Sequence, residues 1–182
     1  PRQVHLFDRP SRFVAGTVGQ PGERTFYLQA SDDAGRTVSV ALEKTQVQVL
    51  ADRMTELLDE IAERPGTVIP PDAPPDDLEP LAAPVDEEVR VAAMGLAWDG
   101  SEQAVVVEAV AAGDEPIEED AILSDSDEGP DALRVTITPA AARAFIARAR
   151  RVIAAGRPAC PLCSLPLDPT GHVCPRQNGY RR

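Results

Sequence analysis

Residues 88–112 read EVRVAAMGLAWDGSEQAVVVEAVAA, two apolar runs on either side of an Asp-Gly turn. A turn of this kind between two β-rich runs predicts a hairpin of two strands, Glu88–Trp98 and Gln103–Ala112. The second run contains Val105–Val107 without interruption, which is typical of a strand buried on both faces. Leu133–Ile137 alternates apolar and polar residues and predicts the last strand of this β section.

A similar series of strands precedes the hairpin. Turns rich in Gly, Pro and Asp separate short β-rich pieces, which predicts an antiparallel meander of Val4–Phe7, Arg12–Val18, Arg24–Ala30 and Thr37–Leu42. A helical pattern follows each β section, one over Thr45–Glu63 and one that begins after the N-cap Thr138. We therefore predict an α+β fold of two antiparallel β sections, each followed by a helix. The pattern leaves one sheet, two sheets and a barrel open.

Two polar segments interrupt these elements. Residues 65–84 contain seven prolines, which predicts a linker or an extended wrapping segment. Residues 113–130 contain eight acidic residues and no basic one, which predicts a solvated, mobile acidic loop. We assign residues 1–156 to the α+β body and residues 157–182 to a zinc-binding, zinc-hook or zinc-ribbon-like C-terminal tail.

The tail contains all three cysteines of the chain, Cys160, Cys163 and Cys174, and also His172. The C-x-x-C pair can bind one metal ion from a tight turn, and His172 and Cys174 point to the same side of an extended strand. Four N and S ligands suit tetrahedral Zn²⁺, and full coordination by protein predicts a structural ion rather than a catalytic one. A redox-active thiol pair and an iron–sulfur cluster are the alternatives.

Charge is distributed unevenly along the chain. The net charge is −12, but residues 134–182 hold nine arginines and one acidic residue and so carry +8, which leaves −20 on the rest. Either the basic end binds an anionic partner, or it lies against the acidic body. The sequence contains neither an apolar run of membrane-spanning length nor an apolar signal-peptide core. We therefore expect a cytoplasmic protein.

Four stretches of the chain carry a family resemblance: HLFDRPSRFVAG at 5–16, MGLAWD at 94–99, GRPACPLC at 156–163 and GHVCPRQNGY at 171–180. They resemble an actinobacterial family catalogued as domain of unknown function 3090, over essentially the whole chain. The resemblance implies no particular reaction. Members of the family are often encoded beside a histidine-phosphatase-like and a lipid-kinase-like protein, which implies a shared pathway.

Basic and aromatic residues around the predicted zinc site are the candidate binding residues: Arg157, Arg176, Tyr180, Arg181 and Arg182. Arginine binds phosphate and carboxylate groups through planar, bidentate donors. The leading hypothesis is a non-catalytic adaptor or regulatory protein that recognises a protein or an anionic ligand. A nucleic-acid-binding protein is one alternative, which the acidic body disfavours. An enzyme acting on a phosphorylated or anionic small molecule is another, although no nucleophile–base motif is present.

The zinc site predicts one zinc ion per purified chain, measured by elemental analysis. Cys163→Ser is expected to lose the ion and to unfold the tail, because structural zinc contributes roughly 10–16 kcal/mol to the folding of small zinc peptides. His5→Ala changes the other histidine of the chain and is the control that keeps the ion. A metal-free protein whose thiols react freely would contradict the zinc site.

Overall fold

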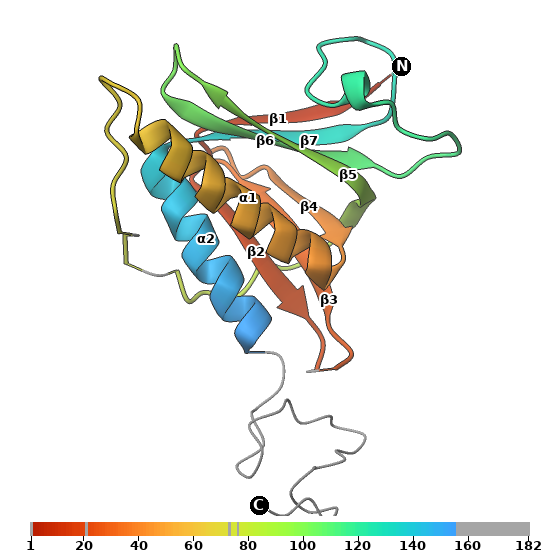
Figure 1. Ribbon diagram of the computed structural model, residues 1–182. Helices are drawn as coiled ribbons and strands as arrows, with labels where there is room; N and C mark the ends of the chain where they lie inside the picture. The colour runs from red at the N-terminus through yellow and green to blue at the C-terminus, as the bar shows by residue number, and fades with distance from the viewer. Residues whose placement is uncertain (1, 21, 73, 76, 156–182) are drawn as a thin grey trace, which may run out of the picture.

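Seven strands and two helices make up the fold, and the computed structural model describes residues 2–155 apart from residues 21, 73 and 76. The elements are β1 (Val4–Asp8), β2 (Arg12–Val18), β3 (Thr25–Ser31), β4 (Thr37–Leu42), α1 (Lys44–Ala62), β5 (Glu87–Asp99), β6 (Ala104–Ala111), the 3₁₀ turn η1 (Glu119–Ala121), β7 (Ala132–Ile137) and α2 (Pro139–Ala154). The strands form one sheet in the order β1-β7-β6-β5-β4-β3-β2 (Figure 1).

The order strand–strand–strand–helix occurs twice along the chain. β2, β3 and β4 form an antiparallel meander that leads into α1, and β5, β6 and β7 form a second meander that leads into α2. The two meanders join through parallel pairing of β4 with β5. The prediction of two antiparallel β sections, each followed by a helix, is therefore confirmed except for its first strand, and both sections belong to a single sheet.

The prediction for the first strand was wrong. β1 does not join the N-terminal meander but pairs in parallel with β7, where Leu6 lies beside Arg134. The chain turns at a corner directly after β1. There Arg9 adopts a positive φ of 48° and donates its backbone N–H to Thr136 O of β7 at 2.8 Å. This corner carries the chain from one edge of the sheet to the other, so β1 and β2 are consecutive in sequence but lie at opposite edges.

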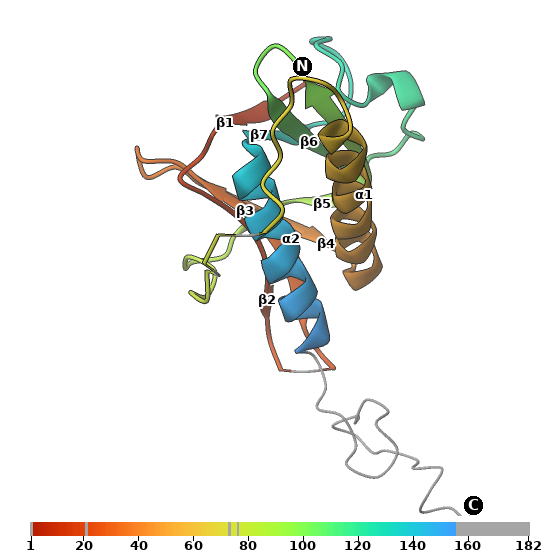
Figure 2. The same ribbon diagram turned by 60° about the vertical axis from the view of Figure 1, so that its left-hand side comes forward.

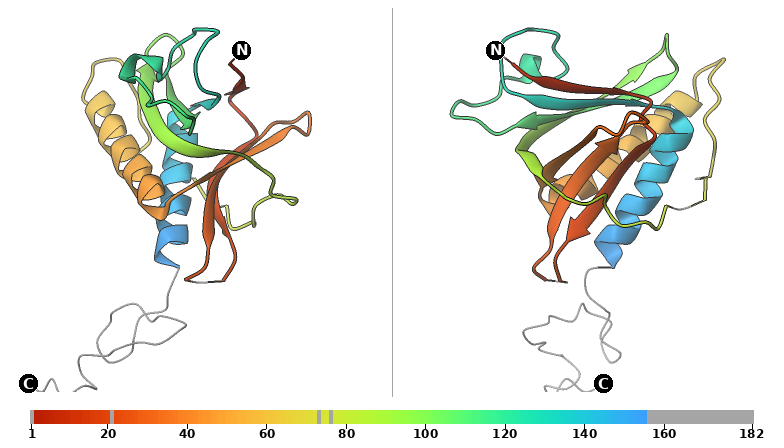
Figure 3. Two further views of the ribbon diagram at one scale, coloured as in Figure 1. Left: turned by 90° about the vertical axis from the view of Figure 1, so that its right-hand side faces the viewer. Right: turned by 180° about the vertical axis from the view of Figure 1, so that it is seen from behind.

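Both helices pack against the same face of the strongly bent sheet (Figures 2 and 3). Their apolar faces complete the core, which includes Leu28, Val40 and Met54, each fully buried. On α2 the Phe145 ring stacks on Phe13 of β2, with ring centroids 4.8 Å apart. Neither helix of the described residues is long and apolar enough to cross a membrane.

Each helix begins directly after a strand and has its own N-terminal hydrogen bonds. The Thr138 side chain accepts from Ala141 N at 3.1 Å, and Pro139 occupies the first turn, which confirms the predicted start of α2. At α1 the side chain of Gln46 accepts from the backbone N–H of the N-cap Glu43 at 2.7 Å. Because no linker separates strand from helix, each helix start is held at the end of the strand that precedes it.

The proline-rich segment covers the opposite face of the first meander (Figure 3, right). We call residues 77–84 the strap. The buried amide of Gln29 donates to Ala82 O at 3.0 Å and accepts from Ala82 N at 2.8 Å. Leu81 lies so close to Gly16 that a Cβ there would come within 2.5 Å of it. The segment predicted as a linker or wrapping segment is therefore bound to the sheet at the strap.

Arginines clamp the start of the strap at Asp77. Arg12 donates to the Asp77 carboxylate at 2.6 Å, which lowers the pKa of that carboxyl below its ordinary value. Arg148 is buried in α2 and reaches from Ala15 O, at 2.9 Å, to Asp77 O, at 2.6 Å. Arg151 donates to the same Asp77 oxygen at 3.0 Å. Arginines of α2 therefore hold the strap, the sheet and the helix together.

Part of the acidic loop, residues 113–130, covers the same face of the second meander. Ile122 lies against Gly95 of β5, where a Cβ would come within 2.3 Å of it. The carboxylate of Glu108, which is fully buried in β6, accepts from Leu123 N, from Arg2 at 2.8 Å and from Arg134 at 3.3 Å. The acidic side chains of the loop point outward, while its centre is bound to the sheet.

Glu108→Gln is expected to lower the free energy of unfolding by about 3 kcal/mol, because it leaves two arginines beside a neutral group. Urea denaturation followed by circular dichroism measures the change. Glu102→Gln removes an exposed carboxylate that pairs with Arg9, and is expected to cost less than about 0.5 kcal/mol. Equal effects of the two substitutions would show that Glu108 does not anchor the loop.

A candidate anion-binding pocket

Strand register brings three cationic residues to one end of the first meander. β3 and β4 pair antiparallel with Phe26 opposite Leu42, so the residues before Phe26 lie beside those after Leu42. Arg24 and Lys44 are two residues from this pair, at the start of β3 and of α1. Parallel pairing of Ala41 with Arg90 adds a third cation from β5.

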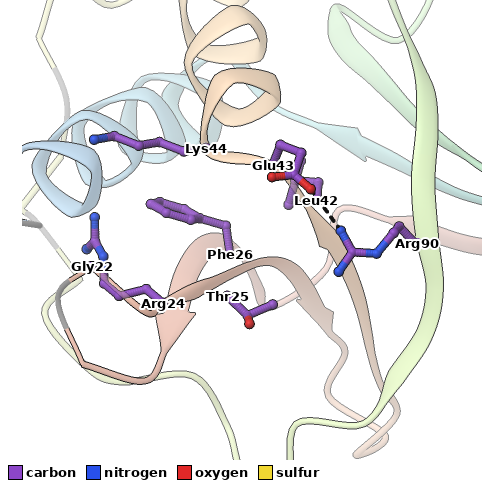
Figure 4. A pocket seen from close by; sticks show the side chains of 8 residues that line it. All are labelled: Gly22, Arg24, Thr25, Phe26, Leu42, Glu43, Lys44 and Arg90. Carbon is purple, nitrogen blue, oxygen red and sulfur yellow. Dashed lines mark hydrogen bonds and ion pairs between the residues drawn. The ribbon is translucent and has the colours of Figure 1, made fainter.

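These residues line a cavity of about 240 Å³ (Figure 4). In that view, the Lys44 amine and the Arg24 guanidinium lie toward one end of the cavity, and Arg90 with Glu43 lies toward the other. Among the described residues, the lining consists of Gly22, Arg24, Thr25, Phe26, Leu42, Glu43, Lys44 and Arg90. With three cations and one carboxylate, the formal charge of this lining is +2.

Arg24 is held in place by contacts on two sides. Its guanidinium donates to Val152 O, in the last turn of α2, at 2.9 Å. The same group lies 4.7 Å from the centroid of the buried Phe26 ring, a cation–π distance. A guanidinium fixed in this way is preorganised, so binding a ligand costs little additional side-chain entropy.

Arg90 pairs only with exposed carboxylates among the described residues. Its guanidinium lies 3.1 Å from Glu43 and 3.9 Å from Glu87, and all three side chains are about half exposed or more. Ion pairs this exposed are worth about 0–1 kcal/mol, so a ligand anion can replace one of these carboxylates at small cost. Arg90 is therefore available for binding even though it is paired in the absence of a ligand.

Lys44 is the only lysine of the chain, and it occupies the first position of α1. A cation there is opposed by the positive end of the helix dipole, so Lys44 does not stabilise its own helix. Among the described residues it has no hydrogen-bond or ion-pair partner, and it is exposed to solvent. A lysine held at the mouth of a basic cavity provides a mobile ammonium group that can bind an anion.

The cavity has the chemistry of a small-anion site. Two guanidinium groups offer planar pairs of donors, which suit the oxygens of phosphate and carboxylate groups. Its volume lies below the roughly 300–1,000 Å³ of pockets that enclose drug-sized ligands. The cavity therefore suits a phosphate or carboxylate group and not a large organic molecule.

All the site residues predicted from the sequence lie outside the described residues. These are the proposed zinc ligands Cys160, Cys163, His172 and Cys174, and the proposed binding residues Arg157, Arg176, Tyr180, Arg181 and Arg182. Within the part of the chain that the structure describes, no group of three or more His, Cys, Asp or Glu side chains could hold a metal ion. The zinc site therefore stays a prediction.

Comparison with known protein families identifies the family of this chain. The family described as protein of unknown function DUF3090 matches residues 5–174. The chain belongs to the DUF3090 family. The matched range ends at the last proposed zinc ligand, Cys174, so it includes all four ligands and excludes Arg176 and the residues after it. No curated protein and no solved structure matches this DUF3090 chain.

Sequence reasoning missed the basic pocket of this DUF3090 protein, although part of the signal was present. The predicted hairpin of β3 and β4 already places Arg24 near Lys44, because their positions mirror each other across the pairing of Phe26 with Leu42. Arg90 had no such signal, because it reaches the pocket through the parallel pairing of β4 and β5.

Lys44→Glu is expected to raise the free energy of unfolding by about 1 kcal/mol, since it replaces an unfavourable charge at the N-terminus of α1 with a favourable one. Thermal and urea denaturation measure the change. Gln48→Glu adds a negative charge beyond the first turn and is expected to contribute less than about 0.3 kcal/mol. Loss of stability in Lys44→Glu would mean that Lys44 makes a stabilising contact of its own.

Proposed function

We propose that this DUF3090 protein is a non-catalytic adaptor that binds a small anionic group, a phosphate in the first instance, in the pocket of Arg24, Lys44 and Arg90. The observation that carries the proposal is the convergence of three cations on one cavity: Arg24 just before β3, Lys44 in α1 and Arg90 in β5. The chain as a whole has a net charge of −12, whereas the described lining of this cavity has a formal charge of +2. Positive charge is therefore concentrated at this concave site.

A binding role fits the lining of the pocket better than a catalytic one. Among the described residues, the lining contains Thr25 and Glu43 but no histidine or cysteine. Glu43 lies in an ion pair with Arg90, so its carboxylate is not directed to a nucleophile among the described residues. Held donors and a mobile ammonium group are sufficient for recognition of an anion.

The pocket lies next to the end of α2, which leads into the C-terminal tail. Arg24 binds Val152 O in the last turn of α2, and the helix ends at Ala154. We propose that residues 157–182 bind one structural Zn²⁺ through Cys160, Cys163, His172 and Cys174. In this proposal the arginines of the tail, Arg157 first among them, add donors for the same anionic ligand or for a protein that carries it.

Titration of the ¹⁵N-labelled full chain with inorganic phosphate tests the pocket by NMR. We expect shifts at the amides of residues 24–26, 42–45 and 90, with a dissociation constant near 1 mM, or about −4 kcal/mol. Lys44→Gln and Arg90→Gln are each expected to weaken binding about tenfold, the effect of losing one charge-assisted hydrogen bond.

Arg64→Gln is the matched control, because it removes one positive charge outside the pocket. Arg64 is exposed and pairs only with Glu60 among the described residues, at 3.7 Å. This substitution is expected to change phosphate affinity less than twofold, as a screened and distant charge should. If Arg64→Gln weakens phosphate binding as much as Lys44→Gln, or if the pocket amides do not shift, the proposed site is wrong.

A further inference from the structure

Within the part of the chain that the structure describes, the second half of β5 has one open edge. β5 pairs with β4 only as far as Arg90, where β4 turns into α1, whereas its pairing with β6 continues to Asp99. Among the described residues, the backbone of residues 92–98 makes no hydrogen bond beyond its ladder with β6. An open strand edge presents a row of unpaired donors and acceptors that can bind another chain.

This edge lies in a groove beside α1. A cavity of about 720 Å³ runs between the helix and residues 92–96 of β5. The helix contributes to the lining from Gln46 to Glu60, a length of roughly 21 Å at the rise of an α-helix. The five lining residues of β5 extend roughly 13 Å, which matches an added strand of about five residues.

Apolar side chains form much of the groove. Val49 on α1 is 51% exposed and lines the groove together with the next residue, the buried Leu50. Leu57, Met94 and Leu96 are only partly buried and pack against the edge of the core. A guest side chain of moderate size, such as valine or leucine, would therefore find apolar contacts on both walls.

Charge at the rim favours a basic guest. Glu56 and Glu60 project from α1, and Glu119 lies at the other side on η1 of the acidic loop. All three carboxylates are exposed, and among the described lining residues Arg53 is the one cation. Basic side chains that flank an apolar strand would meet these carboxylates, which gives the groove charge complementarity.

We propose that the groove between α1 and the open edge of β5 binds an extended, basic segment of a partner protein, which adds as a strand beside residues 92–96. Main-chain hydrogen bonds to the edge supply affinity in this binding mode, and alternate side chains supply specificity. One face of the added strand would contact Val49 and Leu57, while arginine or lysine side chains would lie near Glu56 and Glu119.

The groove is distinct from the anion pocket, although the two approach each other at the start of α1. Lys44 lines the pocket, whereas Gln46 lines the groove and donates to Val91 O at 3.3 Å. The two sites have opposite charge and therefore select opposite partners. Lys44→Gln is expected to leave peptide binding within about twofold of wild type, as a distant, screened charge should, which separates this proposal from the proposed function.

A fluorescein-labelled, eight-residue peptide of alternating valine and arginine is the probe, measured by fluorescence anisotropy on the full chain. We expect saturable binding, with hydrogen-exchange protection gained at the amides of residues 92–98. The same peptide with N-methyl groups at alternate residues should bind at least about tenfold more weakly, because it lacks the donors for a strand edge. A valine–glutamate peptide of equal length should not bind measurably.

Two substitutions on α1 separate a groove effect from a general charge effect. Glu56 lies at the rim of the groove, so Glu56→Lys is expected to weaken binding of the valine–arginine peptide about fivefold. Glu63→Lys makes the same change beyond the groove, at the exposed C-cap, and should alter affinity less than twofold.

Four results would overturn the proposal. The first is equal binding of the N-methylated peptide, and the second is an equal effect of Glu56→Lys and Glu63→Lys. The third is self-association of the peptide-free chain in sedimentation equilibrium with protection at residues 92–98, which would assign the edge to a second copy instead. Protection elsewhere in the sheet, with none at residues 92–98, counts against the proposal in the same way.

Discussion

The change of partner along β5 is the constraint on which the rest of this molecule depends. The strand pairs with β4 up to Arg90 and with β6 from Val91 to Asp99, and its register shifts just after Val91. Parallel pairing on the first side joins the two meanders into one sheet and brings Arg90 beside the start of α1. Beyond Arg90 the chain that formed β4 continues as α1. Among the described residues, β5 therefore has no partner on that side, and its edge is open. The basic pocket and the apolar groove are therefore two consequences of one event in the backbone.

A second regularity is the way each meander is covered on the face away from the helices. In both halves an irregular segment packs on a glycine of the sheet, Leu81 on Gly16 and Ile122 on Gly95. In both, a buried polar side chain binds the backbone of that segment, Gln29 in the first half and Glu108 in the second. A sheet buried on both faces needs such a cover, and a loop can supply it only where its backbone groups are satisfied. The strap and the acidic loop thus perform the same task with different sequences.

Elements could be predicted from this sequence more reliably than their arrangement. Local signals were sufficient for the hairpin of β5 and β6 and for the start of α2, where Thr138 caps the helix. Parallel pairings leave no local signal, because their partners are distant in sequence, so the position of β1 beside β7 could not be derived. The acidic loop shows the limit of composition: its charges predicted solvation, but the arginines that bind its backbone come from distant residues, including Arg2. The pocket was missed for the same reason, since Arg90 enters it through a parallel pair.

The opposite charges of the two proposed sites bear on what this DUF3090 protein does. α1 carries a lysine at its first position toward the pocket, and carboxylates farther along toward the groove. A basic peptide in the groove would not compete with an anion in the pocket, and neither ligand would be repelled by the other. Because both sites contact the same helix and the same strand, they are held at a fixed separation on one rigid support. Binding of an anionic ligand and a basic partner side by side on one support is the arrangement that the proposed adaptor function requires.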